Sequence, residues 1–140
     1  MDVASQLQRP SVRMSETHHQ SIADKDCLVI DSFGLLSSIY RYGQVAYIGG
    51  GFGDGIHNTL EAAVYGLPTL FGPRYHKYKE AIDLIENGGG LTFTNTAGFI
   101  SLMDKFLANP EVIKEAGDIV TGYVKQNSGV TEKILKELPL

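Results

Sequence analysis

The stretch that decides the fold is VAYIGGGFGDGIHNTLEAAVYGLPTLFGP, residues 45–73. It begins with a short apolar run, Val45–Ile48, which is typical of a strand buried on both faces. A glycine-rich loop follows. A helix is then predicted to begin at Asn58, with Glu61 three residues later in the arrangement of a capping box. The pattern therefore predicts a strand, a glycine loop and a helix in direct succession.

The end of this helix and the start of the next strand are also marked by residue type. Gly66 stands where a glycine commonly ends a helix, and Pro68 cannot continue one. The apolar residues that follow predict another buried strand over Leu67–Phe71. We expect one apolar helix face, made of Leu60, Ala63 and Val64.

Glycine occupies five of the seven positions from 49 to 55. Glycine adopts positive φ without strain and lets a ligand approach the backbone closely. A loop that leaves the carboxyl end of a strand and enters a helix N-terminus is suited to binding an anion, because free N–H groups point outward there. The alternative is a glycine-rich turn that binds nothing.

Two well-known phosphate-binding loops do not match this stretch. The dinucleotide fingerprint Gly-x-Gly-x-x-Gly fails because, counting from Gly49, its third glycine position holds Asp54. The P-loop spacing is present from Gly50 to Gly55, but Ile56 stands where the lysine is required. Neither a classical NAD site nor a nucleoside triphosphatase is supported.

Composition limits the class of protein. The chain has 140 residues, 43% of them hydrophobic and 20% charged, which suits one globular domain over residues 1–140. A net charge of −4 argues against nucleic acid or an anionic membrane as a surface partner. The single cysteine, Cys27, excludes an internal disulfide framework and favours a reducing compartment. We therefore expect a cytoplasmic protein without a membrane span, and no cluster of metal ligands is evident.

The rest of the chain alternates predicted strands and helices. Asp31 or Ser32 is expected to cap a helix that carries Leu35 and Ile39. About five short strands alternate with helices, which indicates the α/β class with a parallel sheet. Strands are predicted over 11–15, 27–30 and 91–93, and helices over a segment around 81–85, from Asn95, from Pro110 to about Gln126, and over 131–138.

Several of these motifs together resemble one family. The sequence is similar to the C-terminal half of 3-deoxy-D-manno-octulosonic acid (Kdo) transferases, which are GT-B glycosyltransferases. The resemblance covers residues 9–138 and implies a Rossmann-like, three-layer α/β fold with a parallel sheet. The motifs that carry it are Asp31-Ser32-Phe33-Gly34, residues 45–50, His57-Asn58-Thr59-Leu60-Glu61, Gly66-Leu67-Pro68, Phe71-Gly72-Pro73 and residues 127–131. The family commonly has Thr, an acidic residue and Pro where this chain has Ser32, Leu35 and Ala62.

The resemblance implies roles in binding the donor, CMP-Kdo. Glu61 would accept hydrogen bonds from the ribose hydroxyls, since a carboxylate offers acceptors to both O–H groups of a vicinal diol. Capping of the helix is the competing role for this side chain. The phosphate would be held by Gly49, Gly50, Gly51 and the helix N-terminus near Asn58.

Four further residues receive a role from the resemblance. Phe33 and Gly34 would lie near the base, and His76 and Lys77 would lie toward the Kdo carboxylate. No cofactor is implied. No catalytic residue is expected in this chain, because the family's general base, its acceptor site for the lipid A precursor and its membrane contact belong to an N-terminal domain. The full-length enzyme would work at the cytoplasmic face of the inner membrane in lipopolysaccharide biosynthesis, and the isolated chain is expected to bind nucleotide weakly and to be inactive.

Two other functions remain open from the residues alone. A GT-B enzyme that uses a UDP-sugar would share the architecture and Glu61. A nucleotide-binding or interaction module without activity would also fit the acidic composition and the lack of a catalytic dyad.

Overall fold

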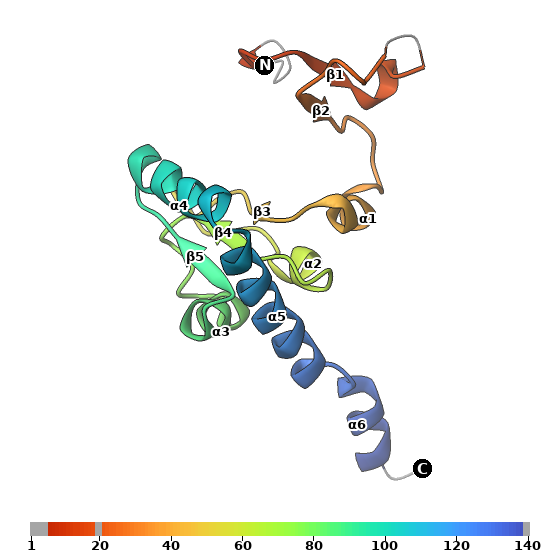
Figure 1. The fold of residues 1–140 in the computed structure, drawn as a ribbon. Coiled ribbons are helices and arrows are strands. Elements are labelled where there is room, and N and C mark those ends of the chain that lie inside the picture. The colour runs from red at the N-terminus through yellow and green to blue at the C-terminus, as the bar shows by residue number, and fades with distance from the viewer. Residues whose placement is uncertain (1–5, 19–20, 139–140) are drawn as a thin grey trace. The chain divides into compact units, whose positions relative to one another are not determined.

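The fold was analysed in a computed structural model that describes residues 6–18 and 21–138 (Figure 1). The chain divides into two compact units, residues 1–39 and 40–140, and each is described by itself. The expectation of one domain over residues 1–140 stays a prediction.

The N-terminal unit contains a two-stranded parallel sheet. Strand β1, Ser11–Arg13, pairs with β2, Cys27–Val29, so that Val12 lies opposite Leu28. A short 3-10 helix, η2, covers Met14–Glu16, and helix α1 covers Leu36–Ile39. Both strands are shorter than the sequence predicted but lie where it placed them.

Asp31 does not cap a helix, which corrects the sequence prediction. Its carboxylate accepts hydrogen bonds from the Ser15 hydroxyl at 2.6 Å and from the Ser15 backbone N–H at 3.1 Å. These bonds are the main reason that the pKa of Asp31 lies below its ordinary value. Ser32 does not cap a helix either, because a turn with Gly34 at a φ of 83° follows it and helix α1 begins only at Leu36.

The C-terminal unit is built on a three-stranded parallel sheet in the order β3-β4-β5. In register, Ala46 lies opposite Thr69, and Thr69 lies opposite Gly90. The glycine loop follows β3, and the segment from residue 72 follows β4, so both leave the same edge of the sheet. The strands are β3 (Ala46–Tyr47), β4 (Thr69–Phe71) and β5 (Gly90–Thr92).

Helices pack against this sheet and against one another (Figure 1). The long helix α5 contacts α2, α3 and α4, while α3 also contacts β5. Asn95 caps α4 by accepting the Gly98 N–H at 2.9 Å, and Pro110 opens α5, as the sequence predicted. The elements are η3 (Tyr40–Tyr42), α2 (Leu60–Ala63), α3 (Lys79–Asn87), α4 (Thr96–Ala108), α5 (Pro110–Asn127) and α6 (Val130–Glu137).

The core of this unit forms two clusters of buried side chains. Phe71 on β4 is completely buried, and burial of a side chain of this size contributes about 1.5–3 kcal/mol. The larger cluster is made of Ala46, Ile48, Ile56, Ala62, Leu67, Phe71 and Ala81, and the smaller one of Ala63, Leu84 and Val120. The core therefore lies under the strand–loop–helix–strand stretch that begins at residue 45.

The apolar face expected for α2 was wrong in two of its three residues. Ala63 is buried, but Leu60 and Val64 are 40% and 64% exposed. Thr59 and Ala62 are fully buried instead. The helix has only one turn, so neighbouring loops rather than a 3.6-residue repeat decide which side chains face the core.

Candidate functional site

The glycine loop is a tight hairpin. Gly50 pairs with Ile56 in an isolated antiparallel bridge. The Gly51 N–H donates to the Gly55 carbonyl at 2.6 Å, and the His57 N–H donates to the Gly49 carbonyl at 3.0 Å. Because the Gly51 N–H is bonded inside the hairpin, that group is not pointed at a ligand.

Close packing explains why two of these positions need glycine. Gly50 and Gly51 have φ values of 91° and 83°, which side chains strongly disfavour. A Cβ at Gly51 would also lie only 2.6 Å from the Cα of Gly72, at the end of β4. Gly49 is less constrained, since a Cβ there would meet only the His57 ring, at 3.1 Å. The structure thus gives Gly50 and Gly51 a structural reason that holds with or without a ligand.

Asn58 follows the returning arm of the hairpin and contacts Glu61 on helix α2. The Asn58 Oδ1 accepts the Leu60 N–H at 3.0 Å, and its Nδ2 donates to Glu61 Oε1 at 3.2 Å. The predicted helix start at Asn58 was wrong, because this side-chain turn keeps residues 58 and 59 outside the helix, which begins at Leu60. The predicted capping box is replaced by the contact between the two side chains.

The short helix changes the electrostatic argument for anion binding. Helix α2 has only four residues, so it aligns few peptide dipoles. An anion at this edge of the sheet would therefore depend on side-chain cations and on individual N–H groups.

Tyr40 is a neighbour of Glu61 that the sequence analysis did not single out. Burial raises the pKa of Tyr40, and the negative charge of Glu61 raises it further. The place of Tyr40 beside a carboxylate depends on how η3 packs, and the local sequence carries no signal for that.

A polar pocket of about 370 Å³ lies beside the hairpin. It contains His76 and Lys77, the two residues expected near the donor sugar, and adds Asp54 and Arg74, to which the sequence analysis assigned no role. Arg74 Nη1 donates to the Gly53 carbonyl at 2.9 Å, and the His76 ring stacks on Tyr75 with centroids 4.4 Å apart. The full lining is Gly53, Asp54, Pro73, Arg74, His76 and Lys77. Three basic side chains against one carboxylate suit an anionic ligand.

Phe33 and Gly34 belong to the N-terminal unit. Phe33 is fully exposed, and Gly34 has a φ of 83° with no atom near the place of a Cβ. Their predicted role near a base stays a prediction.

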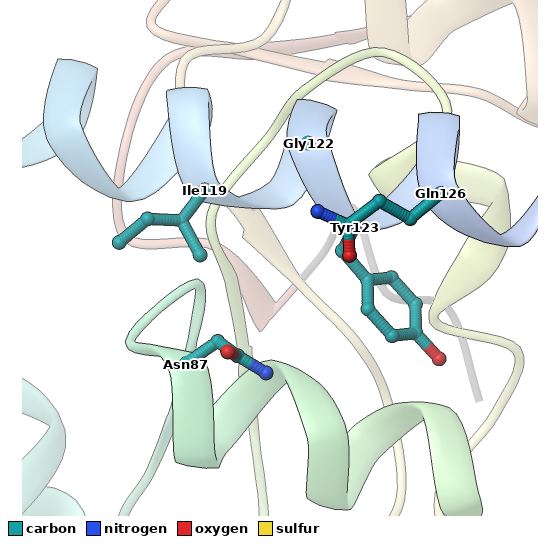
Figure 2. A pocket seen from close by; sticks show the side chains of 5 residues that line it. All are labelled: Asn87, Ile119, Gly122, Tyr123 and Gln126. Atoms are coloured by element: carbon teal, nitrogen blue, oxygen red, sulfur yellow. The ribbon is translucent and has the colours of Figure 1, made fainter.

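Two other hollows contain none of the predicted site residues. Figure 2 shows one of about 230 Å³ between Asn87 on α3 and four residues of α5, namely Ile119, Gly122, Tyr123 and Gln126. The other, of about 490 Å³, is lined by Tyr47, Phe52, Phe93, Thr94, Asn95, Thr96 and Phe99. The four aromatic rings of the second hollow pack on one another, with Phe93 and Phe99 centroids 5.1 Å apart.

Two kinds of feature are absent from the described part of the chain. Across residues 6–18 and 21–138, no three His, Cys, Asp or Glu side chains lie together so as to hold a metal ion. In the same residues, no helix combines the length and the apolar character needed to cross a membrane.

Comparison with known proteins gives the sequence relatives of the chain. No family model matches it. It is 32% identical over 91 residues to the 3-deoxy-D-manno-octulosonic acid transferase of Aquifex aeolicus (strain VF5), across 64% of this chain and 26% of that enzyme. It is 26% identical over 119 residues to the enzyme of the same name from Rickettsia prowazekii (strain Madrid E), across 83% of this chain and 25% of that enzyme. The chain thus spans about a quarter of the length of these relatives.

A solved structure extends the likeness to the fold. The crystal structure of the C-terminal CMP-Kdo binding domain of WaaA from Acinetobacter baumannii matches with a TM-score of 0.68 and 27% identity, covering 84% of this chain and 64% of that one. The chain therefore has an α/β fold with parallel sheets that matches a C-terminal domain of the GT-B glycosyltransferases. More particularly, it is homologous to the C-terminal CMP-Kdo binding domain of the Kdo transferase WaaA. The predicted family resemblance and fold class are both confirmed.

Proposed function

We propose that this chain is the donor-binding part of a Kdo transferase and binds CMP-Kdo. The observation that carries the proposal is the structural match over 84% of the chain to a domain described as binding CMP-Kdo. The reaction proposed for the complete enzyme is transfer of Kdo to a lipid A precursor. The acceptor site, the general base and the membrane contact at the inner face of the inner membrane are assigned to parts of the enzyme outside these 140 residues.

Glu61 is the proposed ligand of the ribose. Asn58 occupies only Oε1 of its carboxylate, so Oε2 is outside that contact. A carboxylate that keeps acceptor positions can receive both hydroxyls of a vicinal diol. Asn58 then orients Glu61, and its amide is proposed as a further donor to a phosphate bound near Gly49, Gly50 and Gly51.

The polar pocket is the proposed site of the donor sugar. His76 and Lys77 are both exposed and both line it. The donor carries a carboxylate on the sugar and a phosphate beside it. The basic side chains of the pocket, such as Lys77, suit these two anionic groups, and the hairpin lies next to them. Phe33 and Gly34 complete the proposal as neighbours of the base.

The isolated chain is proposed to bind nucleotide without transferring sugar. Departure of CMP places negative charge on its phosphate, which cations and N–H groups can stabilise. Transfer also needs a general base for the acceptor hydroxyl. Because that base is assigned to the other domain, Kdo transfer by the purified 140-residue chain would contradict this part of the proposal.

An amide NMR titration tests the proposal. The chain is titrated with CMP, with UMP and NAD as controls. We expect shifts at Gly49, Asn58 and Glu61 that are strongest with CMP. A preference for UMP would move the function to a UDP-sugar enzyme, and no response to any nucleotide would overturn nucleotide binding by this chain.

A further inference from the structure

The tip of the glycine hairpin is tied to the segment after β4 through Arg74. The backbone N–H of Arg74 donates to the Gly51 carbonyl at 3.0 Å, and its guanidinium donates from Nη1 to the Gly53 carbonyl at 2.9 Å. The backbones of Gly51 and Gly72 also pack closely at the base of the hairpin. One residue therefore holds the hairpin at two carbonyls, one at its base and one at its tip.

Besides Arg74, the tip is held by Phe52, whose ring packs on Phe93 with centroids 5.5 Å apart. Phe52, Gly53 and Asp54 are all exposed, and a Cβ at Gly53 would meet no atom within 4 Å. Gly53 also lacks the positive φ of Gly50 and Gly51. Packing therefore does not hold Gly53 itself in place, and the guanidinium contact is the restraint on this position.

The same guanidinium lines the polar pocket. A guanidinium has five N–H donors in a planar fork, and Nη1 spends one of them on the Gly53 carbonyl. The remaining donors can bind a carboxylate or phosphate bidentately. An anion on one side of the fork and a carbonyl on the other would hold Arg74 in a single rotamer.

We propose that Arg74 is a positioning residue that fixes the tip of the glycine hairpin and tightens it when an anion enters the adjoining pocket. The inference rests on the proposed function for its ligand, whose carboxylate and phosphate share the required chemistry. Asp54 also lines this pocket and opposes the anion by charge. Because Arg74 contacts both the pocket and the hairpin, binding of an anion in the pocket stabilises the hairpin that carries Gly49, Gly50 and Gly51.

Hydrogen exchange of the Gly51 amide measures this directly, because that N–H closes the hairpin onto Gly55. The test variants are Arg74→Met and Arg74→Lys. The control is Lys77→Met, which also removes one positive charge from the pocket but leaves the bonds of Arg74 to the hairpin in place. Without ligand, we expect exchange roughly five-fold faster in Arg74→Met, as loss of one hydrogen bond implies, and unchanged in Lys77→Met. Arg74→Lys should restore the slow exchange only in part, since an ammonium lacks the fork.

The second arm adds free Kdo or inorganic phosphate at saturation, which separates the carboxylate from the phosphate as the source of the effect. We expect either anion that binds to slow Gly51 exchange in the wild-type chain but not in Arg74→Met. A residue that only supported the fold would not produce this ligand-dependent difference.

Three results would count against the inference. Equal exchange in Arg74→Met and Lys77→Met without ligand would overturn the fixing role. Equal slowing by an anion in Arg74→Met and wild type would overturn the tightening role while leaving the pocket as a binding site. If neither anion shifts the His76 and Lys77 amide signals of the wild-type chain, the donor-sugar part of the proposed function is wrong, and so is the tightening role. The comparison of the variants without ligand still decides the fixing role.

Discussion

Asn58 donates a hydrogen bond from Nδ2 to Glu61 Oε1 at 3.2 Å. Asn58 lies just before helix α2, and Glu61 lies in its first turn. The carboxylate is thereby oriented by an amide whose own oxygen is held by the Leu60 N–H. A side chain fixed in this way loses less conformational freedom when a ligand binds.

Replacement of Glu61 by Gln tests its proposed role with the ribose. Gln keeps the size and a carbonyl oxygen for Asn58, but it removes the charge that strengthens hydrogen bonds from the diol. We expect affinity for CMP to fall about ten-fold, since bonds to charged groups contribute about 1.5–3 kcal/mol. Calorimetric titration measures the change. The control ligand is 2′-deoxy-CMP, whose affinity should differ little between the wild type and Glu61→Gln. An equal loss of affinity for both nucleotides would mean that Glu61 supports the fold and does not bind the ribose.

Replacement of Gly51 and of Gly53 by Ala should have different effects on the free energy of unfolding. Gly51→Ala places a Cβ 2.6 Å from Gly72 at a φ of 83°, whereas Gly53→Ala meets open space. We expect Gly51→Ala to lower the free energy of unfolding by about 2 kcal/mol or more and Gly53→Ala to change it by less than about 0.5 kcal/mol. Urea denaturation gives both values. Similar losses for the two variants would mean that the contact with Gly72 does not constrain the hairpin.

Asp54 and Lys77 are expected to change anion affinity in opposite directions. Both line the polar pocket, so Asp54→Asn removes repulsion and should tighten binding of free Kdo, while Lys77→Gln removes attraction and should weaken it. We expect changes of roughly two- to ten-fold that shrink as salt is added. NMR titration at two ionic strengths measures them. Changes of the same sign would contradict direct electrostatic action in this pocket.

The contact between Tyr123 on α5 and Asp83 on α3 predicts a dependence of stability on alkaline pH. The Tyr123 hydroxyl donates to Asp83 Oδ2 at 3.1 Å. Burial, together with this bond and the charge of Asp83, raises the pKa of Tyr123 from 10.0 to about 12. A raised pKa means that the folded state retains the proton longer, so this contribution is complete below pH 10 and is lost between pH 10 and about 12.

Comparison of Tyr123→Phe with the wild type isolates this contribution from that of the other tyrosines. The wild type should lose more stability than the variant as pH rises through this range, measured by urea denaturation at several pH values. Parallel curves would show that the hydrogen bond to Asp83 does not persist in solution.

The carboxylate of Asp83 predicts a loss of stability in acid as well, through its bond with Lys79. Lys79 donates to Asp83 Oδ2 at 2.6 Å, and this bond is the main cause that lowers the pKa of Asp83 from 3.8. A lowered pKa gives stability that is present above pH 3.8 and lost as pH falls through the value in the folded state. Asp83→Asn should therefore flatten the acid side of the stability profile. An acid side as steep as that of the wild type would contradict this assignment.

Where sequence alone predicted the structure, the signals were local. Asn95 caps α4 and Pro110 opens α5 because a capping side chain and a fixed φ act on the backbone within a few residues. The strand, glycine loop, helix and strand after residue 45 appear in the predicted order, and the family resemblance placed the whole stretch in the α/β class.

Tertiary structure decided what lies at a distance along the chain. Gly51 meets Gly72, Arg74 bonds Gly53, and Tyr123 bonds Asp83 forty residues away. These contacts depend on the register of β3 against β4 and on how α5 packs on α3, which no pattern of neighbouring residues encodes. For the same reason, the sequence could name a glycine loop and a basic segment as parts of a site, but only the fold placed them on two sides of one pocket.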